Sequence, residues 1–457
     1  SRRCLPRLLR VVQAPRSDRV SGAGPQGRCL PAEPPAGRRA RWLRAGWLRG
    51  SSTQLASAAV AFLMAVLPCQ QKPESTTKDD DELLKLAPVD PYTGKDAAVM
   101  AAAGIVAYGP FAWADNHNTA DIDNVLGERR VLWMETAHFR LGLTLKSASW
   151  PDEQDQKKAL QEELRVLHKR VPKIPEKPKK LDPWIRMHLY AQRVEAAYAE
   201  FLKLIGATDA DFPAKGPKQR EGAYLGLPDK FLVLLFQKKS DMARYMDRFC
   251  NRKEETSSRF FHDKTCQMLV CVAAEGLEGF NEAGIHGHVM FAVYHNLVNG
   301  YNGFFYPLPL WLDEGLAHWY SRSVPTSTIN CQVRDDEAVA EDKQNDWPLK
   351  VRRRAQHEGA WFKFETMAAW EKWEDMGYHA HAQSWSRVDY LMQLDREKFG
   401  LMVRELKGLP LSTASYAEQG AQVRTMAQKL LFDLYEMDAA TFDTKWRDWV
   451  LKTYPKK

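Results

Sequence analysis

The chain lacks several features that define the simpler classes of protein. None of its apolar runs approaches the roughly 20 residues of a membrane-spanning helix, so the 457 residues do not encode a multi-span membrane protein. Only 7 residues are cysteine, which excludes a small disulfide-stapled module. Core-forming residues are abundant, because 44% of the chain is hydrophobic and 15 residues are Trp. This composition excludes wholesale disorder and predicts a globular protein of two or three domains.

Lysine and methionine are absent from the first 50 residues. These residues contain 12 Arg and only two acids, a balance of +10, and the first Met of the sequence is Met64. The other 407 residues carry 53 basic and 56 acidic side chains, so the basic character does not belong to the folded body. Without a basic stripe interleaved with aromatic residues downstream, no nucleic-acid partner is expected. The segment is either a basic disordered extension or a start site placed too far upstream.

A short apolar run follows this basic segment. Three Arg between residues 41 and 49 precede Leu55–Leu67, a pattern typical of a secretory signal peptide. Cys69 then stands where bacterial lipoproteins are lipidated, although Pro68 replaces the small residue of that pattern. We therefore expect residues 1–69 to be a basic extension plus signal peptide. The protein is expected to be exported, periplasmic or secreted, with a lipid anchor at Cys69 as an alternative.

Four cysteines lie downstream of the signal-like segment: Cys250, Cys266, Cys271 and Cys331. An even number permits two disulfides in an oxidising compartment. Buried thiols are an equally good interpretation. The single Cys-x4-Cys spacing does not supply the paired short spacings of a zinc ribbon.

The rest of the chain divides by composition into three parts. Residues 70–95 are polar and contain three prolines, which indicates a linker. Residues 96–282 contain the strand-like patterns and are expected to form an N-terminal α+β lobe with a mixed sheet. Residues 283–457 contain only helical patterns, expected to form two motif helices and a helical C-terminal lobe. Strands early and helices late predict an α+β chain.

Individual elements follow from periodicity. Alternation over Glu135–Leu145 predicts a half-buried strand, and the uninterrupted apolar run Phe231–Phe236 predicts a central strand. Cys266–Ala273 indicates another strand. Helices are expected over Glu153–Lys169, Pro183–Ile205 (capped by Asp182), a segment capped by Ser240, Gln383–Phe399 and Thr441–Tyr454.

Two neighbouring helical segments carry polar groups on apolar faces. His286–Asn299 contains His288 and His295, and Pro309–Tyr320 contains Glu314. The aromatic loop Tyr301–Tyr306 lies between them. Histidine and glutamate at helical spacing are the side chains from which zinc sites are built.

The run Trp311–Ala317, with sequence W-L-D-E-G-L-A, resembles the second half of the zinc site in gluzincin metallopeptidases of the peptidase MA type. In that family this helix supplies the third zinc ligand, here Glu314. The first half is a helix bearing HExxH, whose two His bind zinc and whose Glu takes a proton from the attacking water. Trp133–Leu141 and Gln383–Trp385 extend the similarity to exported bacterial peptidase MA-like proteins over about residues 100–450. The resemblance implies a gluzincin-like fold with a small sheet lobe, active-site helices and a C-terminal helical lobe.

The sequence departs from this family where catalysis takes place. His295-Asn296-Leu297-Val298-Asn299 stands at the HExxH position, so His295 matches the first ligand. Asn296 replaces the general base, and an amide does not accept a proton near neutral pH. Asn299 replaces the second His and is a poor zinc ligand. His295 and Glu314 are then remnant ligands of a degenerate site.

Two functional interpretations follow. In the first, the chain is a catalytically inactive metallopeptidase homologue without a cofactor, and its cleft binds a peptide or a cell-envelope protein. In the second, His288 and His318 replace the lost ligands, and with His295 and Glu314 they hold Zn at a rearranged site.

An active zinc metallohydrolase of this second kind requires a new base, for which Glu282 and Asp313 are the candidates. His379 and His381 are further histidines that the cleft can recruit. A third interpretation is a structural envelope protein, in which the aromatic loop Tyr301–Tyr306 fills the cleft.

Overall fold

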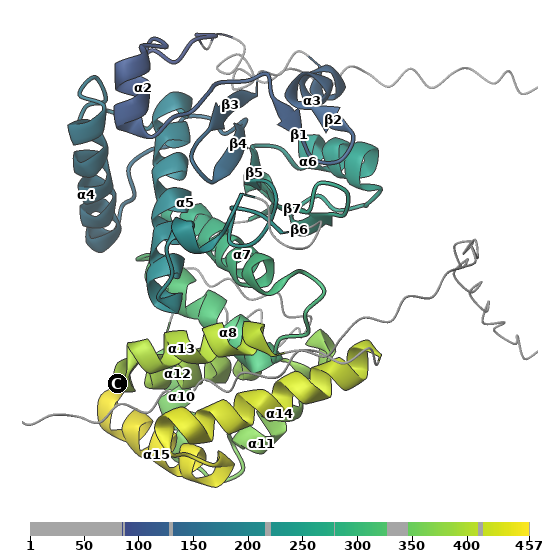
Figure 1. Cartoon of the computed structure of the whole chain (residues 1–457). Coiled ribbons are helices and arrows are strands. Elements are labelled where there is room, and N and C mark those ends of the chain that lie inside the picture. Colours follow the sequence, from purple (N-terminus) through teal and green to yellow (C-terminus); the bar gives the residue numbers. More distant parts are fainter. Residues whose placement is uncertain are drawn as a thin grey trace, which may run out of the picture. The chain divides into compact units, whose positions relative to one another are not determined.

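A five-stranded mixed sheet forms the first half of the fold (Figure 1). The computed structural model describes residues 85, 87–127, 131–214, 221–277, 279–326, 346–409 and 415–456. The strand order is β3-β4-β5-β7-β6, with β4, β5 and β7 parallel and the edge strands β3 and β6 antiparallel to their neighbours. The strands are β3 (Leu132–Glu135), β4 (Phe139–Leu143), β5 (Phe231–Phe236), β6 (Ser257–His262) and β7 (Gln267–Ala273). A separate antiparallel pair consists of β1 (Ala112–Trp113) and β2 (His117–Asn118).

Helices make up the rest of the described chain. Before and between the strands lie α2 (Ala97–Ala103), α3 (Thr119–Leu126), α4 (Gln154–Arg170), α5 (Pro183–Ile205) and α6 (Lys239–Tyr245). After β7 come α7 (Glu282–Asn302), α8 (Leu310–Ser321), α10 (Trp347–Ala355), α11 (Phe364–Ala369), α12 (Tyr378–Leu394), α13 (Arg396–Gly408), α14 (Tyr416–Tyr435) and α15 (Ala439–Thr453). Single helical turns occur at Asp209–Asp211, Met246–Cys250, Ala274–Gly276 and Trp373–Asp375. The α+β class expected from the sequence is confirmed, and so is the mixed sheet.

Strand β5 is the middle strand of the sheet, and both of its faces are covered. Its six residues are all buried, as its apolar run predicts. Alternate side chains enter two different cores: Val233 packs into the large core shared with α5 and α7, and Leu234 into a smaller core shared with α3 and α6. A strand with two covered faces requires an uninterrupted apolar sequence.

Strand β4 differs from its prediction. Its alternating pattern suggests one solvated face, but Gly142 and Thr144 on the second face are buried as well. A side chain at Gly142 would lie only 2.3 Å from the Trp133 ring and 2.6 Å from Leu234. Large side chains on β3 and β5 therefore cover this face, so Thr144 is buried although it is polar.

Several helix boundaries match the sequence and two do not. Asp182 caps α5 by accepting a hydrogen bond from the Ile185 amide, as predicted. Ser240 was expected to cap a helix, but α6 begins one residue earlier, at Lys239, and has no side-chain cap. The single helix expected over Gln383–Phe399 is two helices, because the backbone is extended at Asp395 between α12 and α13.

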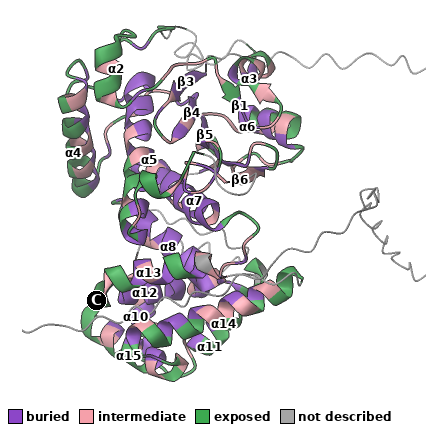
Figure 2. Ribbon diagram, viewed as in Figure 1, coloured by how far each residue is buried: buried purple, intermediate pink, exposed green. Residues whose placement is uncertain are grey.

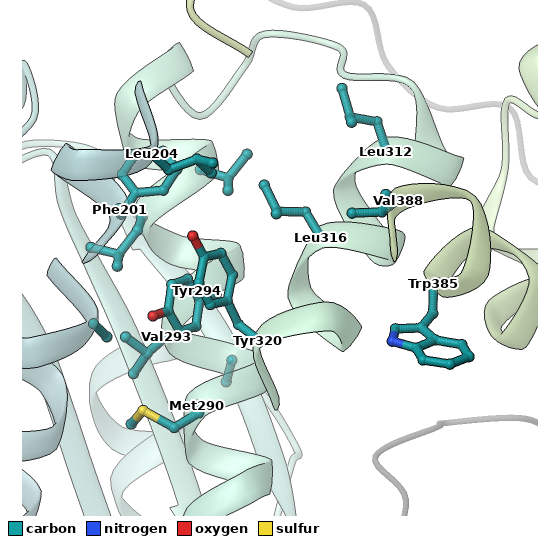
Figure 3. Close-up of a cluster of buried hydrophobic side chains, with 14 of the residues drawn as sticks. Phe201, Leu204, Met290, Val293, Tyr294, Leu312, Leu316, Tyr320, Trp385 and Val388 are labelled. Atoms are coloured by element: carbon teal, nitrogen blue, oxygen red, sulfur yellow. The ribbon is translucent and has the colours of Figure 1, made fainter. Parts of the chain in front are cut away.

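Helices α5, α7, α8 and α12 enclose the main core (Figure 3). The rings of Tyr294 on α7 and Tyr320 on α8 stack with their centroids 3.6 Å apart. Leu316 on α8 and Val388 on α12 belong to the same buried cluster. Figure 2 shows α7 and α8 as largely buried elements, so polar side chains on these helices are held in a dry environment.

Helices α8 and α12 approach closely at a glycine. A side chain at Gly315 would lie 2.6 Å from the carbonyl oxygen of Ser384 and 2.7 Å from Val388. The absence of a Cβ at this position lets the two backbones approach, as Gly commonly does at close helix contacts. The neighbours of Gly315 on α8 are thereby placed against α12.

The predicted extension and signal peptide, residues 1–69 with Cys69, lie outside the described residues, as does Cys331. Residues 73–457 form one compact unit, and the expected division between residues 282 and 283 falls just after the first residue of α7, Glu282. The end of the expected linker is packed, because Asp90 is buried and lies 2.9 Å from His188 on α5.

The part of the chain that the structure describes contains neither a disulfide nor a membrane-spanning helix. Cys250, Cys266 and Cys271 are buried, and none of the three is joined to another described cysteine by a disulfide. No described helix combines the length and the apolar character needed to cross a membrane.

Candidate metal centre

Glu314 lies at the centre of a buried cluster of histidines. Its side chain is 2% exposed on α8, and His295 Nε2 on α7 lies 2.7 Å from its Oε1. Its other oxygen, Oε2, lies 2.8 Å from His381 Nδ1 on α12 and 3.4 Å from His318 Nε2, one turn further along α8. Three helices from separate parts of the sequence thus direct imidazoles at one carboxylate.

The distances in this cluster suit a tetrahedral metal ion. The ligand atoms of Glu314, His318 and His381 all lie within 4.8 Å of one another, and His318 Nε2 is 3.2 Å from His381 Nδ1. Zinc bonds of about 2.1 Å place tetrahedral ligand atoms roughly 3.4 Å apart. Two of the three separations are close to that value, and only the contact between His381 and Glu314 is shorter. We call Glu314, His318 and His381 the metal triad.

Three buried side-chain atoms of the metal triad and of the neighbouring His295 have no assigned hydrogen bond. His295 Nε2, Glu314 Oε2 and His318 Nδ1 are buried atoms that have no hydrogen-bond partner among the described residues, although the first two lie close to oppositely charged groups. Buried polar atoms without partners are rare, because desolvation costs free energy that no bond restores. A metal ion held by Glu314 Oε2, His318 Nε2 and His381 Nδ1 would satisfy the carboxylate oxygen, whereas His318 Nδ1 is the ring nitrogen that does not face the triad.

A second carboxylate orients His295. The ring Nδ1 of His295 donates a hydrogen bond of 3.2 Å to Asp313 Oδ1. Asn299 Nδ2 donates to the same Asp313 oxygen at 3.2 Å and to the His295 carbonyl at 2.8 Å. A carboxylate on one imidazole nitrogen fixes the tautomer and leaves the other nitrogen free for a metal. Asn299, which stands at a lost ligand position, therefore supports Asp313.

The charges in the site follow from burial and proximity. Burial alone would raise the pKa of Glu314, but the imidazoles, His295 foremost, hold that pKa well below its usual range. Burial lowers the pKa of His318 to about 4, so this imidazole is neutral at neutral pH and its lone pair is available. Burial and Arg259 also lower the pKa of His295, but Asp313 and Glu314 outweigh them and raise it.

One side of the cluster opens onto a pocket of about 260 Å³. Its walls include Ser257 and Arg259 on β6, His288 on α7 and Trp373 before α12, together with His295, Glu314 and His381. Glu314 is the only carboxylate among the described lining residues. The pocket gives a ligand access to the metal triad from one side.

The predicted ligands are only partly brought together. His318 lies beside Glu314 as expected, and His295 lies at the second carboxylate oxygen. His288 lines the pocket but is not in the cluster, because its Nε2 shares a hydrogen bond of 2.8 Å with Ser257 Oγ. The remaining triad member is His381. Its position four residues before the inward-facing Trp385, one helical turn away, is the sequence signal that places it on the same face.

The two candidate bases are engaged elsewhere. Glu282 forms buried ion pairs with Arg186 (2.6 Å) and Arg193 (2.9 Å) and lines a different cavity of about 410 Å³. Asp313 is bound to His295 and is not among the lining residues of the pocket. Neither carboxylate is placed to activate a water at the triad.

Two further sequence candidates are outside the pocket wall. The amide of Asn296 is buried, and neither of its polar atoms has a hydrogen-bond partner among the described residues. His379 is partly buried and does not line the pocket. The aromatic loop does not fill the pocket either: Phe304 stacks on Phe261 of β6 with centroids 4.6 Å apart, and Phe305 is 59% exposed.

The arrangement is chemically defined by its donor atoms. One carboxylate and neutral imidazoles are the ligands that zinc prefers at mixed nitrogen and oxygen sites. The buried side of the cluster is closed by Trp347, whose ring lies 4.8 Å from that of His318, and Phe291 in the pocket wall lies 4.7 Å from the same ring. Comparisons of the chain with family models, with curated proteins and with solved structures gave no match, so these donor atoms are the basis for any assignment.

Proposed function

We propose that this chain is a zinc-binding protein of gluzincin-like architecture whose pocket binds a peptide ligand without cleaving it. Glu314, His318 and His381 hold the metal, and His295, oriented by Asp313, lies at the second oxygen of Glu314. The observation that carries the proposal is the approach of three imidazoles to one buried carboxylate. The resemblance of Trp311–Ala317 to the gluzincin ligand helix supports the same role for Glu314.

A bound cation explains the burial of these groups better than a decayed site does. An ionised carboxylate in a dry environment is costly unless it is paired and hydrogen-bonded. Glu314 Oε2 lies 2.8 Å from His381 Nδ1 and 3.4 Å from His318 Nε2, and His318 is held neutral by burial. A dication would compensate the carboxylate and accept the imidazole lone pairs. Metal binding also requires deprotonated ligands, which is the state that burial favours at His318.

The absence of a placed base favours binding over hydrolysis. Metal-assisted hydrolysis requires a group that takes the proton of the metal-bound water. Asn296 stands at the position of that base, and Glu314, the only described carboxylate in the pocket, is a ligand in this proposal. The chain is therefore proposed to be an inactive metallopeptidase homologue.

The ligand is proposed to be an extended peptide because an edge strand forms part of the pocket wall. Strand β6 pairs with β7 alone among the described strands, so its second edge has no strand partner there. Ser257, Ser258 and Arg259 of this strand line the pocket. Extended peptides commonly bind by adding a strand to such an edge. In the exported setting that the sequence predicts, the peptide would come from a cell-envelope or secreted protein.

A second candidate function is a hydrolase that uses His288 as its base. His288 lies in the same pocket wall as the metal triad and is hydrogen-bonded to Ser257 Oγ at 2.8 Å. An imidazole can accept a proton from a metal-bound water near neutral pH. Peptide cleavage that requires both zinc and His288 would favour this candidate over ligand binding alone.

Metal content tests the proposal directly. The chain would be purified without chelator or histidine tag and examined by elemental mass spectrometry. About one zinc per chain is expected, and Glu314→Gln and His318→Ala should each weaken zinc binding at least ~10-fold, because each removes one ligand. Glu365→Gln and His357→Ala, at exposed positions, are the matched controls. A chain that takes up no metal even with excess zinc would overturn the proposal.

A further inference from the structure

Arg259 is a cation in the pocket wall without a protein counter-ion in the described structure. It lies in the middle of the edge strand β6, is exposed, and lines the pocket beside His295 and Glu314. No described residue forms an ion pair or a side-chain hydrogen bond with its guanidinium. The carboxylate of Glu314 is surrounded by imidazoles, so it does not neutralise Arg259. A pocket that exposes an arginine beside a metal site favours an anionic ligand.

The surroundings of Arg259 add hydrogen-bond donors. Ser257, two residues earlier on the same face of β6, has its hydroxyl 2.8 Å from His288 Nε2. Ser258 also lines the pocket. Arg259 lines the same pocket as His295, Glu314 and His381, so it faces the metal centre. An anion bound by Arg259 would therefore lie near the metal rather than on a remote surface.

An aromatic surface continues along the same face of the strand. Phe261 follows Arg259 by two residues, and its ring stacks on Phe304 at 4.6 Å and meets Phe305 edge-on at 5.7 Å. Phe304 and Phe305 are 38% and 59% exposed. Residues two apart on a strand lie on one face about 6 to 7 Å apart. A peptide strand beside β6 would place alternate side chains over Arg259 and over these aromatic rings.

We propose that Arg259 selects a peptide ligand bearing a carboxylate, with an apolar side chain two residues away from it. This inference rests on the proposed function, since it names the class of peptide that the metal-containing pocket binds. The guanidinium holds the carboxylate through two N–H donors, the preferred geometry for this pair. The apolar side chain packs on Phe261, Phe304 and Phe305. Arg259 is a specificity residue and takes no part in holding the metal.

The test is calorimetric titration of the zinc-loaded full-length chain with matched peptides. One acetylated and amidated heptapeptide carries Glu with Phe two residues later, its isostere carries Gln in place of Glu, and a third carries Ala in place of Phe. A fourth peptide carries Gln and a free C-terminal carboxylate. The affinity of this fourth peptide shows whether Arg259 recognises a terminal carboxylate as well as a side-chain carboxylate.

The Glu peptide should bind roughly tenfold more tightly than the Gln peptide, as a charge-assisted bidentate contact requires. In Arg259→Gln this preference should disappear, while the zinc content stays unchanged. Arg404→Gln, an exposed arginine on α13 that does not line the pocket, is the matched control and should keep the preference. The Ala peptide should bind more weakly than the Glu peptide in both variants.

Failure of the inference and failure of the proposed function give different results. Equal affinity for the Glu and Gln peptides in a zinc-containing protein would overturn the role of Arg259 and leave metal binding intact. A preference for inorganic phosphate over every peptide, lost in Arg259→Gln, would replace the carboxylate peptide by a phosphate ligand. A chain without zinc that still prefers the Glu peptide through Arg259 would support the inference and refute the metal centre.

Discussion

His318 Nε2 lies 3.2 Å from His381 Nδ1, although the two histidines are 63 residues apart in the chain. The pair exists because α8 and α12 touch at Gly315, beside Glu314. The metal triad is thus a property of how two helices pack, and its geometry depends on their separation. Changes at the helix contact should therefore affect zinc binding as well as stability.

Gly315→Ala should separate the two helices. The added methyl group would lie 2.6 Å from the Ser384 carbonyl oxygen, a backbone atom that moves only with α12. Overpacking of this kind typically costs about 1–3 kcal/mol of unfolding free energy, and the shift of His381 should lower zinc affinity in parallel. Urea denaturation and zinc titration measure the two effects. Gly420→Ala on α14 is the control, because its nearest neighbour is the movable end of Arg424, at 3.1 Å. Normal zinc affinity in Gly315→Ala would contradict the dependence on helix separation.

Asp313→Asn should weaken zinc binding while the chain stays folded. Asp313 fixes the ring of His295 by accepting a hydrogen bond from its Nδ1. Removing such a supporting carboxylate typically costs about 10–100-fold in metal affinity. Competition with a chromogenic chelator measures the affinity. Asp433→Asn, which breaks only an exposed ion pair with Lys429, serves as the control. An unchanged affinity in Asp313→Asn would show that His295 has no part in the metal site.

Asp443→Ala should strongly destabilise the helical half of the protein. The Arg387 side chain on α12 is fully buried, pairs with Asp443 on α15, and has no other described acidic partner. Asp443 also accepts a hydrogen bond of 3.0 Å from the Phe364 amide. Removing one partner of a buried ion pair leaves an uncompensated charge, which costs about 3–5 kcal/mol. Denaturant unfolding of the variant, compared with Lys429→Gln at the exposed pair, measures the loss. A difference below about 1 kcal/mol would mean that water reaches Arg387.

His262 should make the protein less stable in mild acid. Its side chain is 2% exposed on β6, and burial lowers its pKa to about 4. In the unfolded chain the pKa is about 6.5, so between these two values the unfolded state binds more protons and stability falls as the pH falls. The full effect, reached near pH 4, is about 3 kcal/mol. Unfolding free energies of the wild type and His262→Gln, measured from pH 7 to 5, should show a shallower slope in the variant. Parallel curves would contradict the neutral buried state.

The sequence predicts the elements whose patterns are local. Phe231–Phe236 and Pro183–Ile205 match β5 and α5 because a continuous apolar run and a capped amphipathic helix are complete within their own residues. Strand β6 was missed. Its side chains are mostly half-buried or exposed because it lies at the sheet edge, so no apolar periodicity marks it. The break at Asp395 has a local signal that was overlooked, because the Asp395 side chain caps α13 by accepting a hydrogen bond from the Lys398 amide.

In the candidate site, too, the sequence predicts what depends on local spacing and misses what depends on tertiary packing. Glu314 and His318 are four residues apart on one helix, so their proximity follows from the sequence. His288 shares a helix face with His295, but two turns along α7 correspond to about 10 Å, too far for one metal ion. His288 instead meets Ser257 on β6. Only the packing of α12 on α8 brings His381 to Glu314, and that contact is tertiary.

The grouping of ligands from α7, α8 and α12 has a consequence for the time course of folding. The donor set is complete only after α12 has docked on α8, so a metal ion would bind the folded chain and not the unfolded one. Interactions formed after the transition state slow unfolding and leave the folding rate nearly unchanged. Bound zinc would then slow unfolding. Slower unfolding prolongs the life of the native state and increases its resistance to proteases.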